Sequence, residues 1–127
     1  MQGISEIVGV YHARGSLLGE LSYVVGKVLG RAHCALCDIT HGWSPRERAE
    51  FTSCRVELGV PWRAVHLDEQ EPDLQRFTEG ITPCVVGRRG DGTLVLLMDA
   101  EALEACGGEP RAFVDRLVAR IGESDSA

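Results

Sequence analysis

The feature that most constrains the fold is a short apolar segment followed at once by a long amphipathic one. Residues 4–11 (ISEIVGVY) are apolar and rich in strand-forming side chains, which favours a buried strand. Residues 17–29 then repeat leucine and valine with a helical period, and the neighbouring face carries glycine and serine. A strand that leads into an amphipathic helix predicts an α/β fold. The small face of that helix allows close internal packing or an oligomer contact.

The rest of the chain continues this alternation. A Ser-Pro-Arg-Glu capping box at residues 44–47 opens a helix that we expect to end near Leu58, because Gly59 follows. Repeats, low-complexity tracts and linkers are absent from the sequence, so we expect a single domain over residues 1–122 and a polar tail at 123–127. The remaining expected elements are a strand at 60–67, a helix at 72–79 ended by Gly80, hairpin strands at 81–88 and 93–98, a short helix from the cap Asp99 to Cys106, and a last helix opened by Pro110.

Without the segment that follows the first helix, the expected order is β-α-β-α-β-β-α, and residues 81–86 read ITPCVV before the hairpin turn. This order and the Thr-Pro pair resemble the thioredoxin-like superfamily. The resemblance implies a thioredoxin-like α/β domain in which Pro83 is a cis proline that opens the third core strand beside the active site. Thioredoxins carry C-x-x-C where the first strand meets the first helix, whereas this chain has HARGS at residues 12–16. The resemblance therefore implies that the usual dithiol site is empty, and that an extra helical Cys/His segment is inserted after the first helix.

Charge and hydropathy argue against several classes of function. The chain of 127 residues has a net charge of −6 and no basic stripe, which disfavours binding to nucleic acid or to an anionic membrane. No apolar run approaches the roughly 18 residues that span a bilayer. The first ten residues, MQGISEIVGV, lack the basic and apolar regions of a secretory signal. We therefore expect a cytoplasmic protein whose partner is a protein or small molecule of unknown identity.

The stretch GRAHCALCDITHG, residues 30–42, holds two of the five cysteines and two of the four histidines. At about 100° per residue in a helix, Cys34, Cys37 and His41 fall on one narrow face. Thiolate and imidazole are the ligands that Zn²⁺ takes in tetrahedral sites. An odd number of cysteines in a reducing compartment also argues against a disulfide framework. The sequence therefore predicts a transition-metal centre, with zinc as the favoured metal.

A tetrahedral site needs a fourth ligand, which His33, Cys54, Cys84 or solvent could supply. Cys54 is the most economical choice for a structural site, because it is expected on the next helix. An iron–sulfur cluster would require Cys54 and Cys84 to converge on the C-x-x-C pair. A c-type haem is disfavoured, because Asp38 stands where C-x-x-C-H has its histidine.

The same residues also support a redox interpretation. A C-x-x-C pair can close a disulfide, with Cys34 as the attacking thiol and Cys37 as the resolving one. His33 or His41 would then be the electrostatic partner, and Cys84 a third thiol within reach. The sequence thus leaves a thiol–disulfide oxidoreductase open beside the metal centre.

A third interpretation treats both cysteines as small buried hydrophobic residues in a non-catalytic interaction module. Outside the segment, His12 is the histidine of most interest, because α/β folds place function at strand ends. His66 alternates with apolar residues, and we expect it to be structural.

Overall fold

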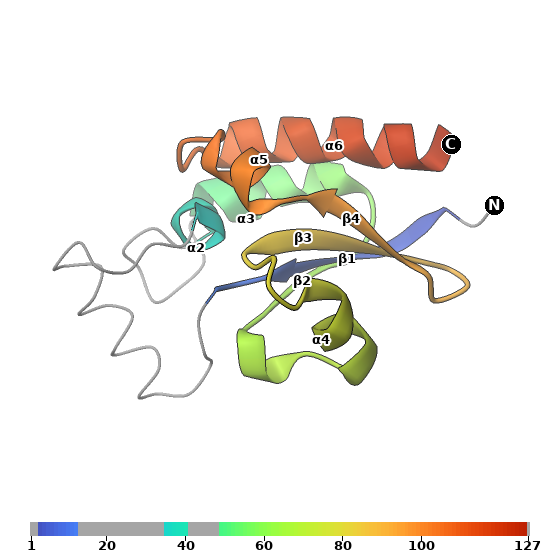
Figure 1. The fold of residues 1–127 in the computed structure, drawn as a ribbon. Helices are drawn as coiled ribbons and strands as arrows, with labels where there is room; N and C mark the ends of the chain where they lie inside the picture. Colours follow the sequence, from blue (N-terminus) through green and yellow to red (C-terminus); the bar gives the residue numbers. More distant parts are fainter. Residues whose placement is uncertain (1–2, 13–34, 41–48, 127) are drawn as a thin grey trace, which may run out of the picture.

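The computed structural model describes residues 3–12, 35–40 and 49–126. Over these ranges the chain is a mixed α/β fold, with one four-stranded sheet and helices on both of its faces (Figure 1). The α/β class is therefore as the sequence predicts. The expected helix at 17–29 and the capping box at 44–47 lie outside the described residues.

The sheet has the strand order β2-β1-β3-β4. Its central strand β1 (Ile4–Val10) runs parallel to β2 (Trp62–Val65), with Val10 opposite Val65 at the carboxyl ends. β2 is shorter than the sequence predicts and begins after Pro61, which has no amide proton to give to a ladder. Because the two strands are parallel, the residues that follow them lie at one edge of the sheet.

The expected hairpin follows on the other side of β1. β3 (Cys84–Arg89) pairs antiparallel with both β1 and β4 (Leu94–Met98). The turn between β3 and β4 contains Gly92 with a φ of 92°, a conformation that glycine adopts without strain. The Thr82–Pro83 peptide bond, just before β3, is cis, as the resemblance implies.

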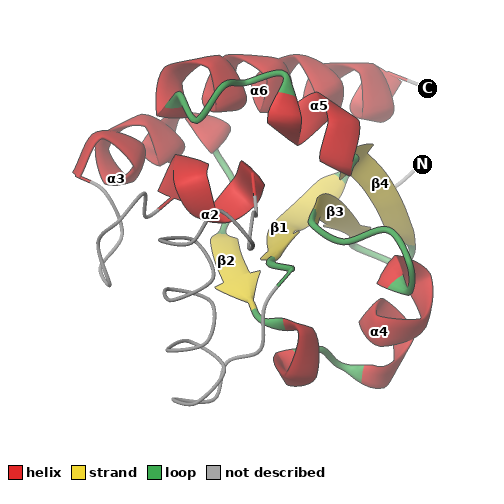
Figure 2. Ribbon diagram, turned by 60° about the vertical axis from the view of Figure 1, so that its left-hand side comes forward, coloured by secondary structure: helices red, strands yellow, loops and turns green. Residues whose placement is uncertain are grey.

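Among the described elements, one face of the sheet is covered by a single short helix, and the other by a group of helices (Figures 1 and 2). The short helix is α4, and the group consists of α2, α3, α5 and α6. The bounds of these helices are α2 Ala35–Thr40, α3 Ala49–Arg55, α4 Pro72–Thr78, α5 Ala100–Glu104 and α6 Pro110–Ser126, with single 3-10 turns at Val56–Leu58 and Leu67–Glu69.

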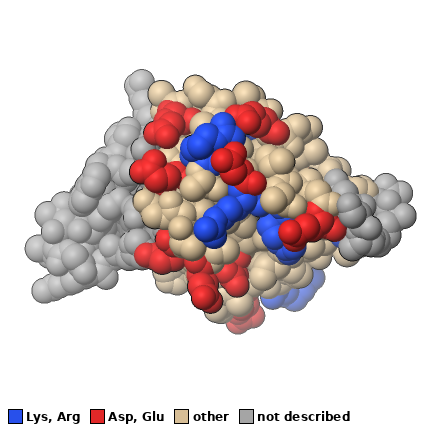
Figure 3. All heavy atoms as spheres, turned by 90° about the horizontal axis from the view of Figure 1, so that it is seen from above, with Lys and Arg blue, Asp and Glu red and all other residues tan. Residues whose placement is uncertain are grey.

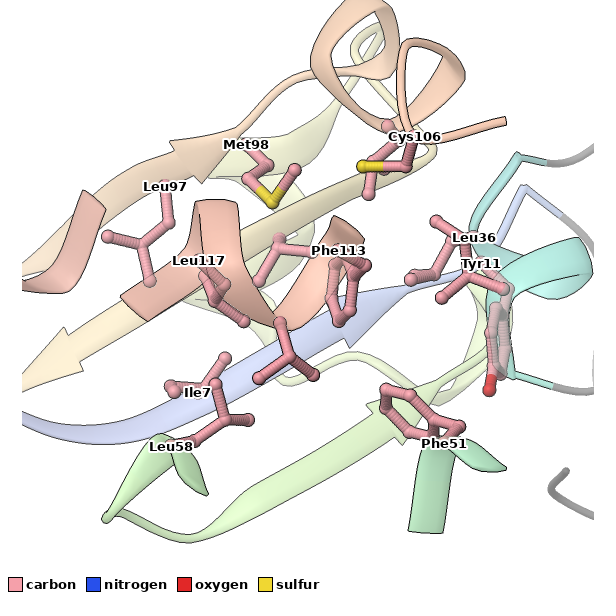
Figure 4. Close-up of a cluster of buried hydrophobic side chains, with 14 of the residues drawn as sticks. Ile7, Tyr11, Leu36, Phe51, Leu58, Leu97, Met98, Cys106, Phe113 and Leu117 are labelled. Carbon is pink, nitrogen blue, oxygen red and sulfur yellow. The ribbon is translucent and has the colours of Figure 1, made fainter. Parts of the chain in front are cut away.

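The larger core lies between the sheet and the helix group. Its centre is an aromatic trio of Phe51, Trp62 and Phe113, whose ring centroids lie 5.4 to 5.9 Å apart. Figure 4 shows leucine and isoleucine side chains from α2, α6 and β1 closing around Phe113. In the described part of the chain, the smaller core under α4 is built from aliphatic side chains and a thiol: Val8, Val10, Val65, Leu74, Cys84 and Val86.

The ends of the helices follow local signals in most cases. Gly59 ends the helical segment after α3 with a φ of 74°, and the Asp99 side chain caps α5 by accepting from the amide of Ala102 at 2.8 Å. The expected polar tail from residue 123 differs from the structure, because α6 continues to Ser126. The reason is tertiary: Ser124 is buried and its hydroxyl accepts a hydrogen bond from Arg89 at 2.9 Å. In the described part of the chain no helix has the length and apolar character to cross a membrane.

Candidate functional site

Of the residues predicted for the metal or dithiol centre, three lie on described elements. Cys37 lies on α2, Cys54 on α3 and Cys84 on β3. His33, Cys34 and His41 lie outside the described residues. The structure therefore places the helix that carries Cys37, and the site can be built from the way that this helix is held.

α2 is held against the core by three fully buried side chains, those of Leu36, Ile39 and Thr40. The Thr40 hydroxyl donates to the Leu36 carbonyl at 3.1 Å, one helical turn back. It is also 2.9 Å from the hydroxyl of Tyr11. Because the single hydroxyl proton of Thr40 is used in the bond to Leu36, Tyr11 is the donor in this second bond.

Tyr11 connects α2 to the carboxyl edge of the two parallel strands. It follows β1 directly, and its ring lies 5.2 Å from the ring of His66, which follows β2. The Nδ1 atom and the backbone amide of His66 both lie 2.7 Å from a carboxylate oxygen of Glu69. These hydrogen bonds hold the pKa of the Glu69 carboxyl below its usual value. His66 therefore has a structural role in capping the turn after β2, as the sequence suggests.

His12 lies at the same edge and faces the start of β3. Its Nδ1 atom is 2.9 Å from the hydroxyl of Thr82, the residue before the cis proline. His12 is exposed to solvent, so its second ring nitrogen is available for a proton or a ligand. Thr82 also lines an open pocket of about 440 Å³ that extends toward Gln70, Arg76 and Glu79. An exposed imidazole oriented by a hydroxyl beside a pocket can transfer protons or bind a polar ligand.

The other cysteines differ sharply in accessibility. Cys84 is completely buried, and burial raises the pKa of its thiol to about 12. In this environment it is a neutral thiol, which disfavours the role of reactive third thiol that its position in the sequence suggested. Cys106 is buried and donates to the carbonyl of Ala102 at 3.5 Å, which is a structural role.

Cys54 is half-buried at the edge of the aromatic core. Its sulfur lies 3.9 Å from the guanidinium Nη1 of Arg111 on α6. Arg111 is itself ion-paired with Glu57 and Asp115, so the charges around Cys54 are balanced within this group. In the described surroundings the Cys54 thiol thus already has a hydrogen-bond partner at the edge of the core.

Within residues 3–12, 35–40 and 49–126, no three histidine, cysteine or acidic side chains form a group that could hold a metal ion. Comparison with family models, with curated proteins and with solved structures finds no match for the chain. The functional argument therefore depends on the chain's own residues.

The site contains contacts that sequence reasoning missed. The strand-end position singled out His12, but its partner Thr82 is 70 residues away along the chain. The Tyr11–Thr40 bond also joins residues that are far apart in sequence. Parallel pairing of β1 with β2 could have indicated that Tyr11 and His66 meet, because both follow the strands directly.

Proposed function

We propose that this chain is a thioredoxin-like domain whose Cys/His segment binds a transition metal, zinc, through Cys34, Cys37 and His41. The fold part of the proposal is supported by the strand order, with one parallel and two antiparallel pairings. Helices on both faces and the Thr82–Pro83 pair at the start of β3 agree with the resemblance. We place the protein in the cytoplasm, where thiol ligands stay reduced.

The observation that carries the metal proposal is the buried face of α2. Leu36, Ile39 and Thr40 use one side of the helix for the core. If the helical spacing of about 100° per residue extends to residues 34 and 41, the three proposed ligands lie about 100–160° away from Leu36. The proposal places the metal on that side of the helix, away from the side chains that bury α2. Two thiols and an imidazole on one helix face are a suitable ligand set for zinc.

For the fourth ligand we favour His33 over Cys54. The Cys54 sulfur already accepts a hydrogen bond from Arg111 in the described structure, so a metal would have to displace this partner. His33 directly precedes Cys34 in the chain and adds an imidazole without bringing in another element. The proposed ligand set is therefore two thiolates and two imidazoles.

Elemental analysis of protein purified without added metal tests this proposal. We expect close to one zinc per chain in the wild type and a large loss in Cys37→Ser. Cys54→Ser is the matched control, because it removes a thiol outside the proposed set and should keep its zinc. Wild-type protein that contains no metal, or equal loss in both variants, would contradict the proposal.

One observation favours a second candidate, a thiol–disulfide oxidoreductase that uses Cys34 and Cys37. Through Tyr11 and Thr40, α2 packs at the same sheet edge as His12 and Thr82, where the resemblance implies an active site. Mild oxidation of the metal-free protein should then remove two free thiols in the wild type and none in Cys34→Ser. A protein that shows neither stoichiometric metal nor this thiol loss would be a non-catalytic interaction module.

A further inference from the structure

The exposed edge of the sheet at β4 has the sequence character of a pairing strand. β4 ends the strand order in the described part of the chain, and its residues are LVLLM. Such an apolar, uncharged edge strand is a template for pairing with another chain. It carries neither lysine nor proline, two residues that commonly prevent such pairing.

The direction of the β4 backbone shows which groups are open to a partner. The Arg89 amide bonds to the Thr93 carbonyl at 2.9 Å, so Thr93 faces β3. Because residues of an antiparallel ladder alternate in direction, Leu94 and Leu96 direct their backbone groups away from β3. A β-bulge follows: Val86 pairs with Leu96 and Val85 with Met98, which leaves Leu97 as the extra residue.

Arg120 of α6 occupies this open edge. Its Nε atom donates to the Leu97 carbonyl at 3.0 Å, and its Nη2 atom donates to the Leu96 carbonyl at 3.2 Å. Its Nη1 atom is held by Glu123 at 2.8 Å. The guanidinium thus uses two carbonyls at the edge, in the groove between β4 and α6 that these residues line.

We infer that Arg120 blocks the open edge of β4 and so keeps two copies of this chain from pairing through this strand. A second copy of this chain is the partner that we expect at this edge. Two LVLLM strands can pair antiparallel about a two-fold axis, and neither strand carries a charged residue. Figure 3, which looks onto the helix-covered face, shows acidic and basic groups interleaved there. Beside the short length and the β-bulge of β4, the guanidinium is a specific barrier at this edge. This inference is independent of the proposed metal centre.

Mass measurements on two Arg120 variants test the inference. Arg120→Met keeps the apolar stem and removes the donors, and Arg120→Ala removes both. We expect both variants to shift toward twice the wild-type mass as concentration rises in light scattering. Arg116→Ala is the matched control, because Arg116 lies one turn earlier on α6, lines the same groove and makes no bond to these carbonyls in the described structure. This control should keep the wild-type mass.

Hydrogen exchange then locates the contact. In the Arg120 variants the amides of Leu94 and Leu96 should gain protection as the mass rises. Wild-type mass for folded Arg120→Met at every concentration would overturn the inference. Association in which the gain of amide protection lies away from β4 would also overturn it. Loss of amide protection throughout the chain would overturn it as well, because Arg120 would then be a residue needed for folding.

Discussion

The two faces of the sheet are stabilised in different ways. The face toward α2, α3, α5 and α6 has large interlocking side chains centred on the aromatic trio. The face toward α4 has a small aliphatic cluster, and around it run ion pairs that join Arg63 to Glu6 and Glu71, and Arg88 to Asp73. The helix group on the first face also carries ion pairs, those of Arg111 with Glu57 and Asp115, so the two faces differ mainly in the size of their buried side chains. Since α2 packs on the aromatic face, the placement of this helix depends on those large side chains.

The largest effect should come from the centre of the aromatic face. Phe113 is completely buried between Phe51 and Trp62, so Phe113→Ala leaves a cavity and should lower the free energy of unfolding by about 3–5 kcal/mol. Leu74→Ala, at the centre of the α4 face, should cost about 2–3 kcal/mol, because its cluster is smaller. Urea unfolding measures both. An equal or larger loss for Leu74→Ala would remove the proposed difference between the faces.

A methyl group added at Gly9 tests how closely side chains from α2 and β2 pack against this residue of β1. Its Cβ would lie 2.6 Å from Trp62 Cη2 and 3.1 Å from Leu36 Cδ2, so both must move. Gly9→Ala should therefore cost about 1–3 kcal/mol as overpacking. Gly122→Ala is the control, since an added Cβ there meets nothing within 4 Å and alanine favours a helix. Thermal unfolding should separate the two variants in opposite directions.

A smaller effect is expected where α2 meets the strand edge. Tyr11→Phe removes the bond to the Thr40 hydroxyl and should cost about 1 kcal/mol. Exchange of the amides of residues 35–40 should accelerate more than exchange in α4, because the lost bond belongs to the docking of α2. Uniform acceleration across both helices would show that α2 has no separate anchor at Tyr11.

The ion pairs on the α4 face should make the stability of this face respond to acid. The Arg88 guanidinium, hydrogen-bonded to Asp73, holds the pKa of that carboxyl below its ordinary value of 3.8. Depressed carboxyl pKa values give stability that is present above the ordinary pKa and is lost as pH falls through the folded pKa. Arg88→Met should therefore cost less stability near pH 3 than near neutral pH. The cost of Phe113→Ala should not change with pH in the same urea titrations, and a matching change would contradict the assignment to charge.

Local sequence signals predicted most of the fold. Pro110, Asp99, Gly59 and Gly80 mark helix ends because their effects act within a turn, and the strand period does not depend on distant residues. The end of α6 could not be predicted, since Ser124 is held by Arg89 from another element. The same applies to Arg120, whose partners are backbone carbonyls that only the folded sheet presents.

The metal chemistry of Cys34, Cys37 and His41 stays a prediction, because Cys34 and His41 lie outside the described residues. The expectation that they share one helix face uses the helical period alone. The burial of Cys84 was missed, because a position after a strand-opening proline does not show which face of the strand the side chain occupies. The meeting of Tyr11, Thr40 and His66 depends on strand pairing and on the docking of α2.

X-ray absorption at the zinc edge of the purified protein tests the central claim most directly. A centre of Cys34, Cys37, His41 and His33 predicts two sulfur neighbours at about 2.3 Å and two nitrogen neighbours at about 2.0 Å. In Cys37→Ser the sulfur signal should halve or the zinc should be lost. Protein without zinc, or zinc surrounded only by nitrogen and oxygen, would contradict the account.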